Sequence, residues 1–178
     1  MLNFIFALVF GALTLMGLGS WFGWLQGVTQ IETPVRLMPD LRSRITWARG
    51  KGPILVEVAG TPFAGLGEAA VAKRVLDLLD GVPAGLAITW TGDPAEAGDP
   101  AYRLRLVFNP QGGDSAAVCG ETAGGVAADG GVRLLAGFCE SGRTLIFTRG
   151  RLGRVTGPDD RRFAELVRLT ARGLMAMN

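Results

Sequence analysis

The sequence predicts an α+β fold: a two-layer sandwich in which two helices pack on a mostly antiparallel sheet of four to five strands, preceded by one transmembrane helix. Three observations support this prediction. An uncharged apolar segment opens the chain, several later segments alternate apolar and polar residues, and two longer segments carry an apolar stripe at helical spacing. The predicted organisation is a transmembrane anchor over residues 1–27, a juxtamembrane linker over 28–52 and a globular domain over 53–178.

The predicted transmembrane helix lies at the start of the chain, where no charged residue precedes Glu32. The 24 residues from Leu2 to Leu25 would form a helix of about 36 Å, enough to cross a hydrocarbon core of about 30 Å. Trp21 and Trp24 are typical of the interfacial end of such a helix. The alternative is a cleaved signal peptide, but the segment lacks basic residues at its start and a clear small-residue cleavage site.

Three glycines near the end of this segment stand four residues apart: Gly19, Gly23 and Gly27. Small residues at this spacing share one face of a helix and let a second helix approach closely. The spacing predicts a helix–helix contact. The alternative is that glycine is simply frequent in membrane helices.

The linker over 28–52 is broken by Pro34 and Pro39. Residues 40–47 could form a short amphipathic helix, with Leu41 and Ile45 one turn apart, and the alternative is a plain linker.

Five segments of the domain read as strands. The clearest is YRLRLVF (102–108), in which apolar residues alternate with Arg103 and Arg105. The other segments are ILVEVA (54–59), LAITWT (86–91), VRLLAGF (132–138) and TLIFTR (144–149). Strict alternation predicts a sheet with one face open to solvent, and such sheets are largely antiparallel.

Two helices are predicted in the domain. The first runs from Glu68 to Asp80 and ends at Gly81. The second begins near Pro158, with Thr156 as its cap and Asp160 favouring the helix dipole. Both apolar stripes need a partner, and the apolar face of the sheet supplies one.

The order of strand, helix, several strands and helix over residues 53–175 resembles, in topology, small modules of bacterial envelope proteins such as the N-terminal domain of TolB and the CsgG-like group. The segments YRLRLVFNP and LLAGFC are also similar to uncharacterised exported or membrane-anchored proteins of alphaproteobacteria. The resemblance implies a module that binds partners rather than one that catalyses a reaction. It transfers no functional residue to this chain.

The chain has two cysteines, Cys119 and Cys139. A metal site would need two further ligands, and a catalytic thiol would need a base that the sequence does not suggest. A disulfide needs only proximity, and it would close a ring of 21 residues and stabilise the fold by about 3 kcal/mol. It would pin the long irregular segment 109–131, a flexible connection or a partner-binding loop, to the sheet. Unpaired thiols are the alternative.

Two other segments offer weaker sites. Gly60, Gly65 and Gly67 lead into the first helix, where exposed amides could bind an anion, but the spacing matches no phosphate motif and a structural turn is the alternative. The carboxylates in TGDPAEAGDP (91–100) lack the spacing of a calcium loop, and the Asp-Pro steps indicate a solvated turn.

Composition excludes several classes of function. The chain has no histidine, which removes Ser-His-Asp and Cys-His catalysis and most zinc and haem sites. A net charge of +2 with scattered arginines argues against a nucleic-acid partner. We expect no cofactor and no metal, and an enzymatic role is left open but not favoured.

The expected function is that of a non-catalytic, membrane-anchored periplasmic accessory or assembly protein, whose partner is a protein of the membrane or periplasm. The alternatives are a small ligand-binding or catalytic periplasmic module, and an accessory subunit of a larger membrane complex. The expected location is the inner membrane, single-pass, with the domain in the periplasm because a disulfide needs an oxidising compartment. The arginines after the anchor leave a cytoplasmic domain as the alternative.

Overall fold

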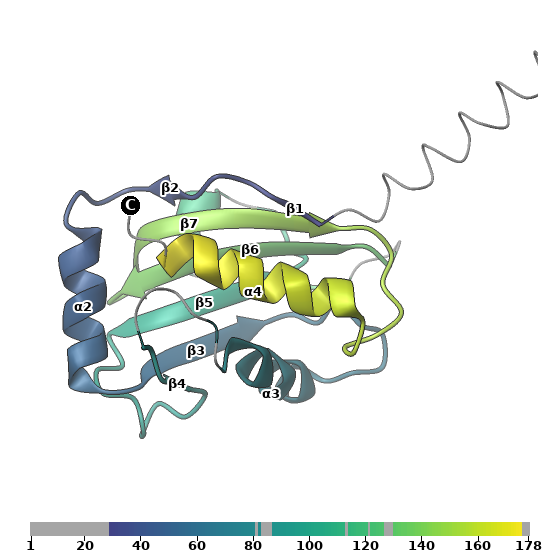
Figure 1. Cartoon of the computed structure of the whole chain (residues 1–178). Helices are drawn as coiled ribbons and strands as arrows, with labels where there is room; N and C mark the ends of the chain where they lie inside the picture. The colour runs from purple at the N-terminus through teal and green to yellow at the C-terminus, as the bar shows by residue number, and fades with distance from the viewer. Residues whose placement is uncertain are drawn as a thin grey trace, which may run out of the picture.

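The computed structural model describes residues 29–80, 82, 87–112, 114–120, 122–126 and 130–175. The predicted anchor and its glycine face, Gly19, Gly23 and Gly27, lie outside the described residues. In chain order the elements are β1 (Gln30–Ile31), β2 (Val35–Arg36), α2 (Leu41–Lys51), β3 (Ile54–Ala59), α3 (Glu68–Leu79), β4 (Trp90–Thr91), β5 (Tyr102–Phe108), the short 3-10 helix η1 (Ser115–Ala117), β6 (Val132–Glu140), β7 (Arg143–Leu152) and α4 (Arg161–Met175) (Figure 1).

The sheet is seven-stranded and mixed. Its strand order is β1-β7-β6-β5-β3-β4, with β2 also paired to β7. Strands β5, β6 and β7 are antiparallel neighbours, whereas β3 runs parallel to both β4 and β5. The parallel pairing follows from α3, because a helix between two strands returns the chain to the same end of the sheet.

The predicted architecture therefore needs correction. In place of four to five mostly antiparallel strands and two helices, the described residues form seven strands and three α-helices. Three of the strands, β1, β2 and β4, are two residues long. Alternation cannot be recognised over the two residues of β1 or of β2, so those strands left no signal in the sequence. Of the predicted strand over 86–91, the structure shows β4 at Trp90–Thr91 alone among the described residues.

The region after the predicted anchor also differs from the expected linker over 28–52. Strands β1 and β2 pair with β7, and α2 buries Leu41, Ile45 and Ala48 in the core. The short helix considered over 40–47 exists and runs on to Lys51. Residues 29–52 are thus an integral part of the domain.

No helix in the described part of the chain combines the length and apolar character needed to cross a bilayer. The predicted spanning helix falls on residues 1–27, which the structure does not describe. The expected single-pass inner-membrane location is corrected accordingly, because no helix among the described residues supports it.

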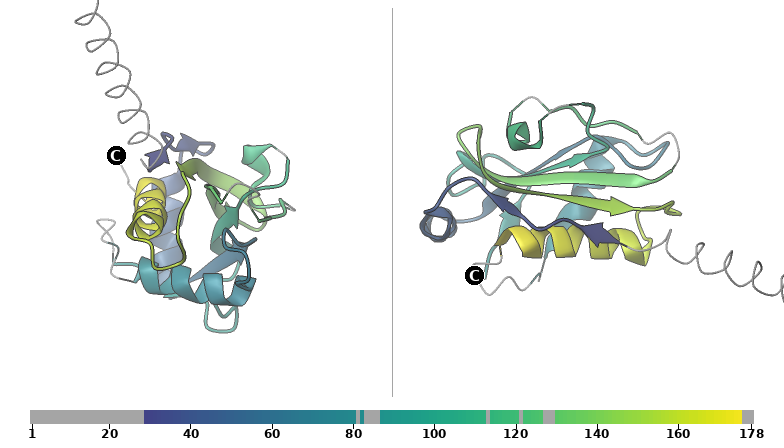
Figure 2. Two further views of the ribbon diagram at one scale, coloured as in Figure 1. Left: turned by 90° about the vertical axis from the view of Figure 1, so that its right-hand side faces the viewer. Right: turned by 90° about the horizontal axis from the view of Figure 1, so that it is seen from above.

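Other parts of the chain pack against both faces of the sheet. Helices α3 and α4 pack on one face, and the segment that contains η1 lies across the other (Figure 2). On β5 the side chains of Leu104, Leu106 and Phe108 face the helices in a large apolar cluster, whereas Val107 faces the η1 segment in a second, smaller one. The predicted solvent-facing side of the sheet is therefore partly covered: the η1 segment buries some of it, whereas Arg133, Arg149 and Arg151 on the same face stay exposed.

Glu140 connects α2 to the end of the sheet. Arg44 of α2 and the hydroxyl of Tyr102 on β5 both donate hydrogen bonds to its carboxylate. The bond to Glu140 raises the pKa of Tyr102 above its ordinary value, with burial adding to the effect. This polar contact fixes α2 against β5 and β6.

Helix α4 begins at a cap that the sequence placed differently. Thr156 was the expected cap, but Asp160 directly precedes the helix and accepts a 2.9 Å hydrogen bond from the backbone N–H of Arg162. The Arg162 guanidinium also donates to this carboxylate at 2.8 Å, and it holds the pKa of Asp160 well below its usual range. The carboxylate thus caps the first turn of α4 and places a negative charge at the positive end of the helix dipole.

Candidate functional site

Cys119 and Cys139 form a disulfide with their Cα atoms 5.6 Å apart, which confirms the predicted pairing. Both residues are buried: Cys119 lies just after η1, and Cys139 lies near the end of β6. The bond therefore joins the η1 segment to the centre of the sheet.

Val118 packs next to this disulfide. It lies over Gly137 of β6, where an added Cβ would come within 2.4 Å of the Val118 Cγ1. Only a residue without a side chain lets the η1 segment approach the sheet this closely. Around this contact Val107, Leu135 and Phe147 complete the apolar layer beneath the segment.

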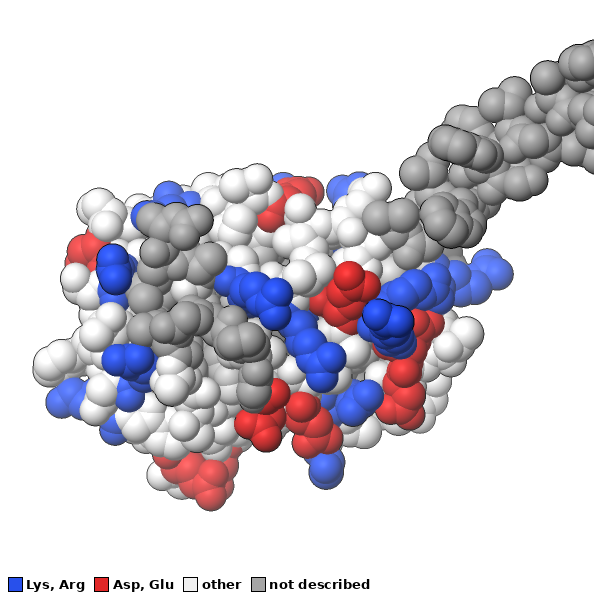
Figure 3. All heavy atoms as spheres, in the orientation of Figure 1, with Lys and Arg blue, Asp and Glu red and all other residues white. Residues whose placement is uncertain are grey.

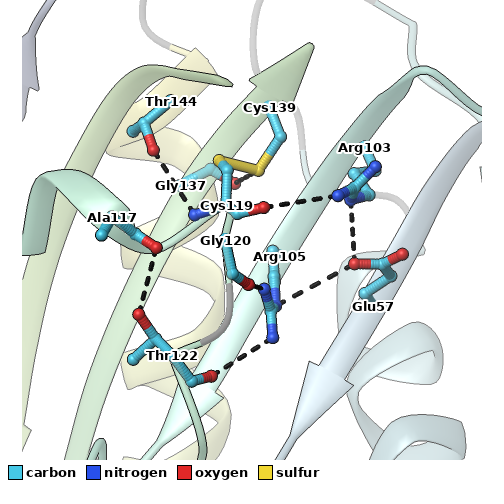
Figure 4. Close-up of polar contacts among 10 residues, drawn as sticks. All are labelled: Glu57, Arg103, Arg105, Ala117, Cys119, Gly120, Thr122, Gly137, Cys139 and Thr144. Atoms are coloured by element: carbon cyan, nitrogen blue, oxygen red, sulfur yellow. Dashed lines mark hydrogen bonds and ion pairs between the residues drawn. A yellow bond between two sulfur atoms is a disulfide. The ribbon is translucent and has the colours of Figure 1, made fainter. Parts of the chain in front are cut away.

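Two arginines of β5 hold the continuation of this segment (Figure 4). Arg105 donates to the backbone carbonyl of Gly120 and, at 3.2 Å, to that of Thr122. Arg103 donates a long 3.4 Å bond to the carbonyl of Cys119. Glu57 of β3 balances both charges, with its Oε2 at 2.9 Å from the Arg103 Nε and 4.0 Å from the Arg105 Nε.

The segment 114–120 with 122–126 is thus held in place and is not a loose connection. The hydroxyl of Thr122 donates to the carbonyl of Ala117, and the backbone N–H of Cys119 donates to the hydroxyl of Thr144 on β7 (Figure 4). Asp114 caps η1 through a 2.9 Å bond from the N–H of Ala116. A disulfide, an apolar contact and charged hydrogen bonds all fix one conformation.

The candidate anion site at Gly60, Gly65 and Gly67 lies at the start of α3. The amide of Gly60 donates a 2.6 Å bond to the carboxylate of Glu68, and Gly67 occupies the cap position of the helix. A carboxylate of the chain itself therefore holds the Gly60 amide. Anion binding there remains a prediction.

The acidic loop between β4 and β5 forms part of a surface hollow together with the end of α3. Within the loop, Thr91 donates to Glu96, and Asp93 accepts from the N–H of Ala95, as expected for a turn. No cluster of three or more histidine, cysteine or acidic residues within the described ranges is placed to hold a metal ion.

A different surface, which the sequence reasoning missed, lies beside the η1 segment. We call it the β7 strip and define it by Val35, Arg133, Phe147, Arg149 and Arg151. In the ladders Arg133 lies directly opposite Arg151, and Val35 lies opposite Phe147. Directly opposite residues share one face of a sheet, and so do alternate residues of one strand. The strip therefore runs along one face of β7 from a basic end to an apolar end.

The arginines of the β7 strip are exposed, and they differ in whether their guanidinium groups have a partner. Arg149 donates at 2.8 Å to the Ser115 hydroxyl of η1 and at 3.2 Å to Glu32, and its guanidinium lies 6.0 Å from the ring of Phe147. The guanidinium groups of Arg133 and Arg151 have no hydrogen bond or ion pair within the part of the chain that the structure describes. The sequence could not predict the β7 strip, because Arg133 and Arg151 come together only through the register between β6 and β7.

The opposite face of the molecule differs in its charge. Around α4, basic and acidic side chains are interspersed (Figure 3). Several of them form ion pairs, such as Arg74 with Asp159 and Arg162 with Asp160. The described surface thus offers unpaired, directly opposed arginines at the β7 strip rather than on the face around α4.

Comparison with known proteins adds little to this description. No family model matches the chain, and no curated protein matches it. Among solved structures, the chain is similar to the PelC dodecamer from Paraburkholderia phytofirmans, with 14% identity, a TM-score of 0.46, and coverage of 85% of this chain and 99% of that chain. A variant of the same protein, also a dodecamer, gives 15% identity and a TM-score of 0.45, with coverage of 85% and 100%. Likenesses this weak assign no family to the chain, and the resemblance to TolB and CsgG-like modules remains unconfirmed.

Proposed function

We propose that the protein is a non-catalytic accessory or assembly protein that acts through contacts with another protein, and that the β7 strip is its contact surface. The observation that carries the proposal is the combination, at this strip, of an exposed apolar side chain with two directly opposed arginines. Val35 is 46% exposed, and it lies on the same face as two opposed arginines whose charges are not balanced by the described residues. Exposed apolar side chains together with arginine are typical of protein interfaces.

The rigidity beneath the strip supports the same proposal. The disulfide, the Val118–Gly137 contact and the Arg149–Ser115 hydrogen bond all hold the surface next to the strip in one conformation. A surface that is ordered before binding loses little conformational entropy when a partner docks. The long segment between β5 and β6 therefore acts as a support for a contact surface.

The expected alternatives have weaker support. A small-ligand site would draw on the hollow at Trp90, but its loop carboxylates Asp93 and Glu96 already accept hydrogen bonds within the loop. A subunit joined through Gly19, Gly23 and Gly27 would depend on residues outside the described part of the chain.

Site-specific photocrosslinking in cells of the native host tests the proposal. A photoreactive amino acid at Val35 should give a discrete crosslinked protein species. The same group at Ala69, an exposed position on α3 at the opposite side of the sheet, should not. The proposal is abandoned if neither position gives a protein adduct, or if both give the same diffuse pattern.

A further inference from the structure

We propose that the β7 strip binds an extended acidic segment of a protein partner, with carboxylates at alternate positions. This inference rests on the proposed function and names the chemistry of the partner. It starts from the charge of the strip: it carries three arginines, Arg133, Arg149 and Arg151, of which Arg149 forms an ion pair with Glu32.

The spacing of the arginines matches an extended chain. Arg149 and Arg151 are alternate residues of one strand, so their Cα atoms lie about 6.6–6.8 Å apart along it. In an extended peptide, side chains that point to the same side repeat at the same distance, so two successive carboxylates can meet two successive guanidinium groups. Arg133, directly opposite Arg151, adds another cation with its Cβ about 5 Å to the side.

Two of these arginines are placed where a bound anion would stabilise the sheet. Like charges directly opposite each other on a sheet destabilise it. Arg133 and Arg151 form such a pair, and neither guanidinium has a partner among the described residues. A carboxylate between them would remove the repulsion, and the planar guanidinium fork matches a carboxylate geometrically.

The apolar end of the strip indicates what accompanies the carboxylates. Phe147 lies beneath Arg149, and Val35 extends the apolar surface toward the edge of the sheet. An acidic segment that continues into a large apolar residue would bury this end of the strip.

Other polyanions fit the chain less well. A nucleic acid would need a wider basic surface, but the chain has a net charge of +2 and interspersed charges around α4 (Figure 3). An anionic membrane needs a broad apolar face beside the cations, whereas this end of the strip has one large exposed apolar residue, Val35, with Leu37 two positions further along the chain.

The test measures binding of three fluorescent peptides to the full-length protein by anisotropy. The first alternates Glu and Thr and carries Leu at both ends. The second replaces each Glu by Gln, and the third gathers the same Glu residues into one block. The first should bind most tightly. Replacing two arginines (Arg133→Gln together with Arg151→Gln) should weaken it roughly 2- to 30-fold, as expected for the loss of two exposed ion pairs.

The matched control replaces Arg161 and Arg172 by Gln. These are exposed residues of α4, and their replacement changes the net charge equally. It should leave peptide binding within twofold of the parent. Thermal unfolding should show that Arg133→Gln with Arg151→Gln is at least as stable as the parent, because the replacement removes a repulsion.

Three results would overturn the inference: equal loss of binding in both double variants, no preference for Glu over Gln, or tighter binding of the blocked peptide than of the alternating one. Vesicles of phosphatidylglycerol that bind through the same arginines, while the peptides do not, would overturn it in favour of a lipid. A protein adduct at Val35 without peptide selectivity would leave the proposed function standing and reject only the acidic partner.

Discussion

Gly137 shows how one residue sets the position of a whole segment. Its missing side chain leaves room for Val118, and that contact seats the η1 segment beside the disulfide. The sequence offered no reason to single it out, because Gly137 lies inside a strand and its neighbour in space is 19 positions away in the chain.

We expect Gly137→Ala to lower the free energy of unfolding by about 1–3 kcal/mol, since the new Cβ would overlap Val118. Adding Val118→Ala to the same chain should recover part of the loss. The matched control is Gly50→Ala in α2, where nothing lies within 4 Å of the new Cβ. Helix propensity should make that variant more stable by about 0.5–1 kcal/mol. Urea denaturation measures all three, and equal losses at both glycines would contradict this account.

A second residue, Asp160, makes stability depend on pH. Its folded-state pKa is depressed by Arg162, so its contribution is complete above the unfolded pKa of about 3.9 and is lost as the pH falls through the folded value. Asp160→Ala should cost about 0.5–2 kcal/mol at pH 7. This difference from the parent should narrow below about pH 4. Denaturation midpoints at pH 7, 4 and 3 would show it. Glu165→Gln, an exposed change on the same helix, serves as control.

At the scale of single residues, the sequence predicted which face of the sheet a side chain occupies but not what covers that face. Arg103 and Arg105 were correctly placed opposite the apolar residues of β5, because alternation fixes the face. Alternation does not say what covers that face, and here the carbonyls of residues 119, 120 and 122 do. The β7 strip was missed for a related reason, since a ladder register is a property of two strands.

At the scale of elements, length decided which predictions held. Helix α3 begins at the predicted Glu68 and ends at Leu79, and β5 coincides with the predicted 102–108. Strands β1 and β2 are too short for periodicity and depend on pairing with a longer neighbour. The predicted strand over 86–91 proved too long, since β4 spans Trp90 and Thr91. The parallel direction of β3 against β5 depends on a crossover that a list of elements does not show.

The η1 segment is the element whose stability can be tested most directly. Replacing Cys119 and Cys139 by Ala should lower the free energy of unfolding by about 2–4 kcal/mol, because the unfolded chain regains the freedom of the ring. The folded η1 segment should keep its arginine contacts, so limited proteolysis between residues 114 and 126 should accelerate only modestly.

The matched comparison adds Arg105→Ala to the cysteine-free chain. Without the disulfide and without this guanidinium, cleavage of the η1 segment should become much faster. If the cysteine-free chain alone is cleaved as fast as an unfolded chain, the arginines do not hold the segment independently.

At the scale of the whole molecule, residues 29–52 form part of the folded core. Their helix buries Leu41, Ile45 and Ala48, and their strands cover β7. Burial of the two larger side chains alone contributes on the order of 3–6 kcal/mol, a large share of the 5–15 kcal/mol by which domains are stable.

A chain that begins at residue 53 should therefore be largely unfolded, whereas one that begins at residue 29 should unfold cooperatively. Circular dichroism during urea titration distinguishes the two. The integral role assigned to α2 would have to be given up if the shorter chain showed the same midpoint as the longer one.

Both margins of the sheet consist of very short strands. Pro34, which has no N–H to donate, stands between β1 and β2, and β4 at the other margin spans only Trp90 and Thr91. A neighbouring molecule thus finds only very short edge strands on which to pair, and short edge strands are one of the ways in which sheets avoid polymerisation. The fold should resist edge-to-edge aggregation in concentrated solution, and whatever it recognises must be recognised by side chains.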